Sequence, residues 1–183
     1  MNKVVISVLG HDRPGIIARV TAAISEKDGN IENVSQTIVQ SEFSGLFIAS
    51  FPSNNQTESL QAYFQDQVAD MGLKAYVESL KASKPVATVS SQPFVITTQG
   101  PDRKGLVAAM TAVIASFNVN VTNLQAVFKG GDDPSQNIMI YEVDVPLDTS
   151  KQVLDVALRE KAEELGLDIS IQHRHIFEAI NRI

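Results

Sequence analysis

The sequence of 183 residues predicts an α+β fold in which the element order β-α-β-β-α-β occurs twice. Two observations predict it. The segment from Val5 to Asn33 recurs without a gap from Val95 to Asn123. In both copies, apolar residues alternate along short segments and recur at helical spacing between those segments. Because hydrophobic residues make up 44% of the chain, either one large core or two smaller cores could be filled.

The repeat is carried by identical residues at equivalent positions. In the first copy these are Val5, Ile6, Gly10, Asp12, Arg13, Gly15, Ala18, Thr21, Ala22, Ile24, Asn30 and Asn33. A turn at residues 130–134 lengthens the second copy. Beyond that turn the register resumes, with Pro52 matching Pro146 and Gly72 matching Gly166. The chain is therefore a tandem duplication.

Each copy opens with a β-branched apolar segment, at residues 4–9 and 94–98, which predicts a strand that ends in a glycine loop. A one-sided helix follows in both copies, and Asp12 and Asp102 are its predicted N-cap residues. Two extended segments then predict a hairpin. They are residues 31–40 with 46–51 in the first copy and 121–128 with 138–145 in the second.

A second helix and a final strand complete each copy. Thr149 and Gln152 predict a capping box at the start of the second copy's helix. Gly72 and Gly166 fit the C′ position, just beyond the helix end. The final strands alternate in hydrophobicity, at residues 73–77 and 167–171.

This order is most commonly assembled as a four-stranded antiparallel sheet with both helices on one face, the ferredoxin-like arrangement. We therefore expect two ferredoxin-like domains in tandem. Their expected extents are a first domain at residues 1–80, a linker at 81–91, a second domain at 92–175 and a C-terminal tail at 176–183 with room for a helical turn.

Composition excludes several function classes. Without cysteine the chain has no disulfide, no thiolate nucleophile and no Cys-ligated zinc. The net charge of −6, with no basic run, counts against direct nucleic-acid binding. No apolar stretch approaches the roughly 20 residues that span a bilayer. We expect no signal peptide, no membrane contact and a cytoplasmic location.

The two strand-to-helix loops are the candidate ligand sites. Glycines at 10 and 15, and again at 100 and 105, let a ligand approach the main chain, and a helix N-terminus offers free N–H groups to an anion. The alternative is purely structural: tight turns, aspartate caps, and exposed ion pairs of Arg13 and Arg103. Spacing alone does not decide between them.

At these residues the sequence resembles the ACT domain family. The motifs are residues 10–17 with 29–33, and residues 100–107 with 120–123. The resemblance implies a βαββαβ fold, pairing of ACT units, and binding of an amino acid near the first loop, with an effect on a partner protein. Chains of two ACT domains are most similar to the family of glycine cleavage system transcriptional repressors. A related opening begins the regulatory domain of formyltetrahydrofolate deformylases.

The resemblance also implies the ligand-side residues. They are Gly10, His11, Asp12, Gly15, Ile16, Asn30 and Asn33 in the first copy, and Gly100, Asp102, Gly105, Leu106, Asn120 and Asn123 in the second. The second copy departs from the pattern where Pro101 replaces His11 and Lys104 replaces Pro14. The resemblance implies that the protein is not an enzyme and has no cofactor. It also implies a homodimer.

Helix length limits how these residues can act together. The loop at Gly10 and the side chain of Asn33 lie at opposite ends of a helix that is about 20 Å long. One amino acid cannot touch both, so a shared ligand would need the loop of one repeat and Asn123 of the other, or an equivalent in a second chain.

Other side chains offer weaker alternatives. His173 and His175 could chelate a metal from the last strand, but no third ligand is placed near them, so we expect solvent-facing histidines and no metal site. His11 could act as a general base, yet no nucleophile is fixed beside it. A module that only oligomerises, without binding a ligand, stays open.

Overall fold

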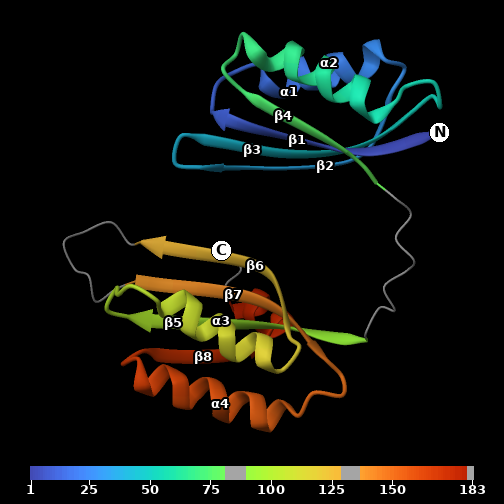
Figure 1. Ribbon diagram of the computed structural model, residues 1–183. Coiled ribbons are helices and arrows are strands. Elements are labelled where there is room, and N and C mark those ends of the chain that lie inside the picture. The colour runs from blue at the N-terminus through green and yellow to red at the C-terminus, as the bar shows by residue number, and fades with distance from the viewer. Residues whose placement is uncertain (81–89, 129–136, 181–183) are drawn as a thin grey trace. The chain divides into compact units, whose positions relative to one another are not determined.

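A computed structural model describes residues 1–80, 90–128 and 137–180 (Figure 1). The chain divides into two compact units, Met1–Val86 and Ala87–Ile183. Most of the predicted linker, and the predicted turn at 130–134, lie outside the described residues. Ser91, the last residue assigned to the linker, already belongs to the first strand of the second unit.

The first unit has the predicted order of elements. They are β1 (Asn2–His11), α1 (Ile16–Glu26), β2 (Asn30–Val39), β3 (Glu42–Phe51), α2 (Thr57–Ala69) and β4 (Lys74–Ser79). The sheet order is β2-β3-β1-β4 with every neighbour antiparallel. Both helices cover one face (Figure 1), where Val4, Ile6 and Val8 of β1 are buried. The predicted ferredoxin-like fold is confirmed.

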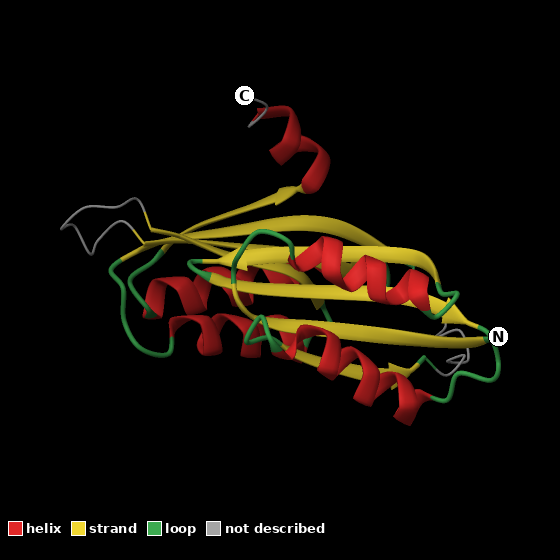
Figure 2. Cartoon of the chain, turned by 90° about the horizontal axis from the view of Figure 1, so that it is seen from above, coloured by secondary structure: helices red, strands yellow, loops and turns green. Residues whose placement is uncertain are grey.

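The second unit repeats this topology with the sheet order β6-β7-β5-β8. Its elements are β5 (Ser91–Gly100), α3 (Leu106–Ser116), β6 (Asn120–Phe128), β7 (Asn137–Pro146), α4 (Lys151–Glu164) and β8 (Asp168–His173). A further short helix, α5 (Arg174–Ile180), leads to the C-terminus (Figure 2). The helical turn expected in the tail is therefore present, but it begins inside the predicted second domain.

Helix α5 gives the second sheet a partial cover on the face away from α3 and α4. Val95, on that face of β5, is only 2% exposed, whereas Val5, its counterpart in β1, is partly exposed. Arg174 at the start of α5 pairs with Glu142 of β7 at 2.8 Å and donates to the Thr122 hydroxyl. The two sheets therefore present different outer faces.

The first hairpin is tighter than predicted. Strand β3 begins at Glu42 instead of residue 46, and only Gln40 and Ser41 separate it from β2. Gln40 takes a left-handed conformation with φ 56°, as a two-residue hairpin turn requires. The polar residues that suggested a longer loop instead pair with the end of β1, where Glu42 lies opposite His11.

The predicted helix starts are wrong. The N-cap residues of α1 and α3 are Gly15 and Gly105, not Asp12 and Asp102. The predicted capping box at Thr149 is also absent, because Ser150 is the N-cap of α4 and the Thr149 hydroxyl donates to the Phe117 carbonyl. Backbone geometry at the glycines replaced the side-chain caps that the residue types suggested.

The predicted helix ends are confirmed. Gly72 and Gly166 take left-handed φ values of 72° and 62°. Around each glycine, paired backbone hydrogen bonds form the Schellman motif, for example from Leu73 N to Val68 O at 3.2 Å and from Leu167 N to Ala162 O at 2.8 Å. These turns deliver the chain directly into the edge strands β4 and β8.

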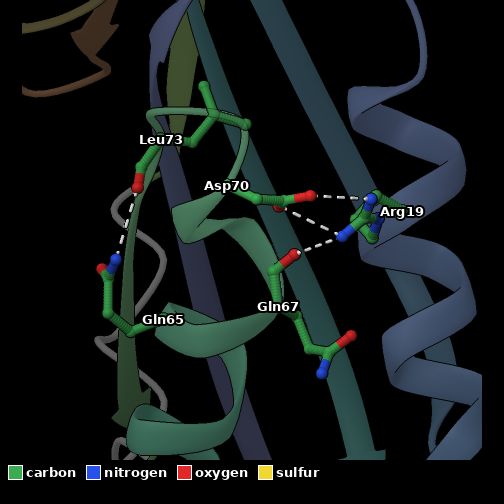
Figure 3. A network of polar contacts seen from close by, with 5 residues as sticks. All are labelled: Arg19, Gln65, Gln67, Asp70 and Leu73. Carbon is green, nitrogen blue, oxygen red and sulfur yellow. Dashed lines mark hydrogen bonds and ion pairs between the residues drawn. The ribbon is translucent and has the colours of Figure 1, made fainter.

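One further contact joins the two helices of the first unit. Arg19 of α1 donates to the Gln67 carbonyl at 3.0 Å and pairs with Asp70 at 3.2 Å (Figure 3).

Within the described residues, no helix is both long enough and apolar enough to cross a membrane.

We predict an unusual tyrosine titration from the same interface. Desolvation first, and then the hydrogen bond to Glu26, raise the pKa of Tyr63 to about 12. The neutral hydroxyl therefore stabilises the fold below pH 10, and this contribution is lost as the pH rises through 12. In an ultraviolet pH titration, Glu26→Gln should lower the Tyr63 midpoint only partly, because burial remains. An unchanged midpoint would contradict the assigned role of Glu26.

Candidate functional site

The start of α1 and the start of α3 share one geometry. Gly15 and Gly105 are the N-cap residues, with φ 96° and 89°, and neither helix has a side-chain cap. A Cβ built on either glycine would meet nothing within 4 Å. The space beside each N-cap glycine is therefore open, which leaves room for an anionic group near the helix N-terminus.

Gly10 and Gly100 have a different environment. A Cβ at Gly10 would lie 2.7 Å from Leu73 Cδ2, and one at Gly100 would lie 2.7 Å from Leu167 Cδ2. These glycines let the end of β1 or β5 pack against the turn before β4 or β8. The structure thus gives both a packing reason to be glycine, and their role toward a ligand stays a prediction.

The polar residues of the first loop are exposed. His11 is the last residue of β1, and its Nδ1 lies 3.4 Å from Glu42 Oε1, with both side chains more than half exposed. The Asp12 backbone N–H donates to the Ser41 carbonyl at 2.7 Å, which orients the loop. Among the described residues, Glu42 is the hydrogen-bond partner of the His11 ring.

Asn30 and Asn33 lie at the other end of the sheet. Asn33 is opposite Ile48 of β3, whereas Gly10 is opposite Phe43 of the same strand. Five strand residues separate these positions, which is about 16 Å. The structure therefore brings Gly10, His11, Asp12, Gly15 and Ile16 together, and keeps the asparagines apart from them within one domain.

In the second copy, two predicted residues already have partners. Asp102 accepts a hydrogen bond from the Asn137 amide at 3.2 Å. Asn123 donates to Glu142 at 2.8 Å, and Glu142 is the carboxylate held by Arg174. Asn120 matches Asn30 in position, at the start of β6. Gly105 is the N-cap residue and Leu106 the first residue of α3, as Gly15 and Ile16 are for α1.

A polar cluster that the sequence analysis missed lies in the core of the second domain. Thr98 is 2% exposed, Asn137 is 9% exposed and Tyr141 is fully buried. Burial raises the pKa of Tyr141, and the nearby Thr98 hydroxyl partly offsets this. Among the residues that the structure describes, Tyr141 Oη and Asn137 Oδ1 have no hydrogen-bond partner of acceptable geometry.

The first copy has Val8, Phe43 and Phe47 at these positions. Comparing the two halves of the repeat side chain by side chain could have revealed the cluster. Buried polar groups without partners are costly, so their presence in one copy only indicates a local requirement of the second domain.

The two C-terminal histidines do not share a strand as predicted. His173 ends β8, whereas His175 lies in α5, and their ring centroids are 5.1 Å apart. His173 also packs edge-on against Phe94 at 5.3 Å. In the described part of the chain, no group of three or more His, Cys, Asp or Glu side chains could hold a metal ion.

Two βαββαβ domains in tandem, each with a glycine loop at the start of its first helix, define a tandem ferredoxin-like protein. The chain belongs to the ACT domain family: the family model matches residues 2–78 and 92–172. It is therefore an ACT-domain regulatory protein.

Curated relatives match about half of the chain. A UPF0237 protein of Methanosarcina acetivorans is 32% identical over 102 residues, covering 52% of this chain and all of the relative. A UPF0237 protein of Neisseria meningitidis serogroup A is 33% identical over 97 residues, covering 49% and 96% of the two chains.

Solved structures match the tandem arrangement. A protein of unknown function from Galdieria sulphuraria has a TM-score of 0.75 at 22% identity, covering 94% of this chain and 98% of its own. A candidate glycine cleavage system transcriptional repressor has a TM-score of 0.69 at 19% identity, covering 93% and 96%. At these identities the likeness shows the shared fold.

The different surroundings of the two loop glycines predict different tolerances. Gly10→Ala should reduce the free energy of unfolding by about 1–3 kcal/mol, because the new methyl group overlaps Leu73 and residue 10 has a φ of 150°, which side chains disfavour. Gly15→Asn should cost less than about 1 kcal/mol, because asparagine tolerates left-handed φ and the space is open. Urea unfolding of both variants tests this; equal losses would refute the packing role given to Gly10.

Proposed function

We propose that this protein is a non-enzymatic sensor that binds a small amino acid and modulates a partner protein, such as a transcription regulator. One observation carries the proposal: both copies repeat an uncapped helix N-terminus behind an open left-handed glycine. A glycine N-cap has no side chain that could occupy this position, so it leaves the place beside the first N–H groups to a ligand acceptor.

The chemistry of the loop fits an amino acid. The ligand carboxylate would accept from the first N–H groups of α1, beginning at Ile16, in the field of the helix N-terminus. Asp12 would supply the negative charge for the ligand ammonium. The open space at Gly15 leaves room for the ligand beside the helix N-terminus.

The proposed site is composite. Since Asn33 lies about 16 Å from Gly10 in its own domain, an asparagine that completes the site must come from another ACT unit, either Asn123 of the second repeat or an equivalent in a second chain. A homodimer in the cytoplasm would supply such an arrangement. The net charge of −6 favours an effect on a protein partner over direct binding to nucleic acid.

The tandem likeness to a candidate glycine cleavage system transcriptional repressor supports glycine or serine as the first ligands to test. The alternatives are an ACT pair that only oligomerises, and a stand-alone relative of the regulatory domain of formyltetrahydrofolate deformylases. The uncapped helix starts favour the ligand-binding interpretation over the first of these.

A thermal-shift screen of the common amino acids tests the proposal. A ligand that binds only the folded chain raises its melting temperature, by mass action. We expect one small amino acid to raise it in a concentration-dependent way, and a bulky one such as tryptophan to leave it unchanged. No shift with any amino acid at millimolar concentration would overturn the amino-acid sensor and leave the two alternatives.

Replacing Asn123 by Ala tests the composite site. If Asn123 binds the ligand held at the Gly10 loop, calorimetry should show about tenfold weaker affinity, which corresponds to about 1.4 kcal/mol. Gln125→Ala, on the same face of β6, is the matched control and should leave affinity unchanged. Wild-type affinity in both variants would place the asparagine outside the site.

A further inference from the structure

The outer edge of the last strand has different hydrogen-bond partners in the two domains. In the first domain, two glutamines of α2 bond the outer edge of β4. Gln61 donates to the Ala75 carbonyl at 2.9 Å and accepts from the Val77 N–H at 2.6 Å. Gln65 donates to the Leu73 carbonyl at 3.3 Å (Figure 3) and accepts from the Ala75 N–H at 3.0 Å. These side chains satisfy the edge groups that another strand would otherwise bond.

In the second domain the same helix positions hold Asp155 and Arg159. Instead of reaching β8, these side chains bond each other, at 2.8 Å and 3.1 Å. By the equivalent register, the backbone groups of Ile169 and Ile171 point outward as those of Ala75 and Val77 do. Among the described residues, no side chain of α4 bonds this edge, so β8 presents a free row of donors and acceptors.

Helix α4 also packs less closely on β8 than α2 does on β4. A cavity of about 310 Å³ opens between α4 and the sheet, lined mainly by apolar side chains and rimmed by Lys151, Gln152 and Asp155. A shallower one of about 450 Å³ follows along the edge, between Arg159 and Ile169.

Smaller side chains account for the first cavity. Phe51 and Phe64 pack edge-to-face in the first domain with ring centroids 6.1 Å apart. Val145 and Leu158 stand at these positions in the second domain, and both line the cavity. The second domain thus lacks both the two aromatic rings and the two glutamines of the first domain. The space between α4 and the sheet, and the outer edge of β8, are therefore less filled.

The charges along this side of α4 alternate. Lys151, Asp155, Arg159 and Glu163 follow one another at four-residue spacing, which aligns them on one stripe of the helix. Read in reverse, this row of charges is complementary to itself. An antiparallel copy would place Asp155 opposite the partner's Arg159, and Lys151 opposite the partner's Glu163.

We propose that β8 is a homodimer interface, where a second copy of this chain adds its own β8 antiparallel across a twofold axis at Ile169. Each Ile169 would then exchange both backbone hydrogen bonds with the partner's Ile169, and Leu167 would face the partner's Ile171. The two sheets become one continuous sheet. Because paired strands lie about 4.8 Å apart and each pair is covered by one helix, the two α4 helices meet at ordinary helix spacing, near 10 Å.

This inference rests on the proposed pairing of ACT units and deepens it, and it is independent of ligand binding where Asn123 of the same chain completes the composite site. The charge row selects a second copy over an unrelated peptide, because an unrelated strand would have no reason to match four alternating charges. It also explains why glutamines cover the last strand in one domain and not in the other, since a twofold dimer needs only one such strand in each chain.

Restoring the glutamines tests the role of the edge. Light scattering of the full chain at micromolar concentration should show a dimer for the wild type and a monomer for the double variant Asp155→Gln, Arg159→Gln, in which the edge is covered as in the first domain. A wild-type monomer, which would leave β8 free for an extended segment of another protein, overturns the proposal. So does a double variant that stays dimeric.

Exchanging charges tests the orientation and excludes misfolding as the cause. Asp155→Lys places lysine opposite the partner's Arg159, and Arg159→Glu places glutamate opposite the partner's Asp155, so each variant alone should be monomeric. An equimolar mixture should form the heterodimer, because lysine then faces glutamate. Failure of the mixture to associate overturns the antiparallel arrangement.

Disulfide trapping tests the register, since the chain has no native cysteine. Asp168 would face the partner's Ser170 in a closely spaced pair without its own hydrogen bonds across the interface. A mixture of Asp168→Cys and Ser170→Cys chains should therefore form a cross-linked dimer on mild oxidation. The matched pair on β4, Lys74→Cys with Tyr76→Cys, should not. Equal cross-linking of both pairs overturns the proposal.

The amino-acid thermal shift is then measured on the Asp155→Gln, Arg159→Gln variant. If the variant is monomeric and the amino acid still raises its melting temperature, the interface is supported and ligand binding does not depend on it. A wild-type dimer without any ligand shift overturns the sensor but not the interface.

Discussion

The architecture of each domain depends on one close approach, between the glycine at the end of the first strand and the turn before the last strand. At Gly10 and Gly100 a single methyl group would overlap Leu73 or Leu167. That contact lets the Schellman turn deliver β4 or β8 alongside the central strand. Five residues further along, a left-handed glycine, Gly15 or Gly105, begins the first helix of each domain.

Much of the fold could be predicted because its determinants are local and repeated. The order of elements, the sheet topology and the glycine helix ends followed from periodicity and from residues matched between the copies. The helix starts could not be predicted, since Asp12 is a good capping residue by type, whereas the backbone turns at Gly15. The short hairpin turn was hidden because Glu42 and Ser44 are polar, although pairing with β1 makes them strand residues.

Only the backbone features of the candidate site could be predicted from the sequence. Glycine loops identify the helix starts, but whether a glycine faces a ligand or a neighbouring turn depends on contacts distant in the sequence, as Gly10 and Leu73 illustrate. The polar cluster of Thr98, Asn137 and Tyr141 depends likewise on three strand positions that only the folded sheet brings together. Identical positions in the repeat preserve the fold, and the non-identical ones distinguish the two domains.

The difference between the two domains at their last strands, β4 and β8, has a physical reason. An uncovered edge strand is a hazard, because any strand can pair with it. Two amide side chains on α2 reduce the hazard at β4, since glutamine has both the donor and the acceptor that a strand edge requires. A charged pair on α4 cannot do this at β8, because neither side chain has both groups. The two copies therefore differ at their last strands: glutamines cover β4, whereas β8 lies beside an ion pair in a charge row that is complementary to itself, as the proposed dimer requires.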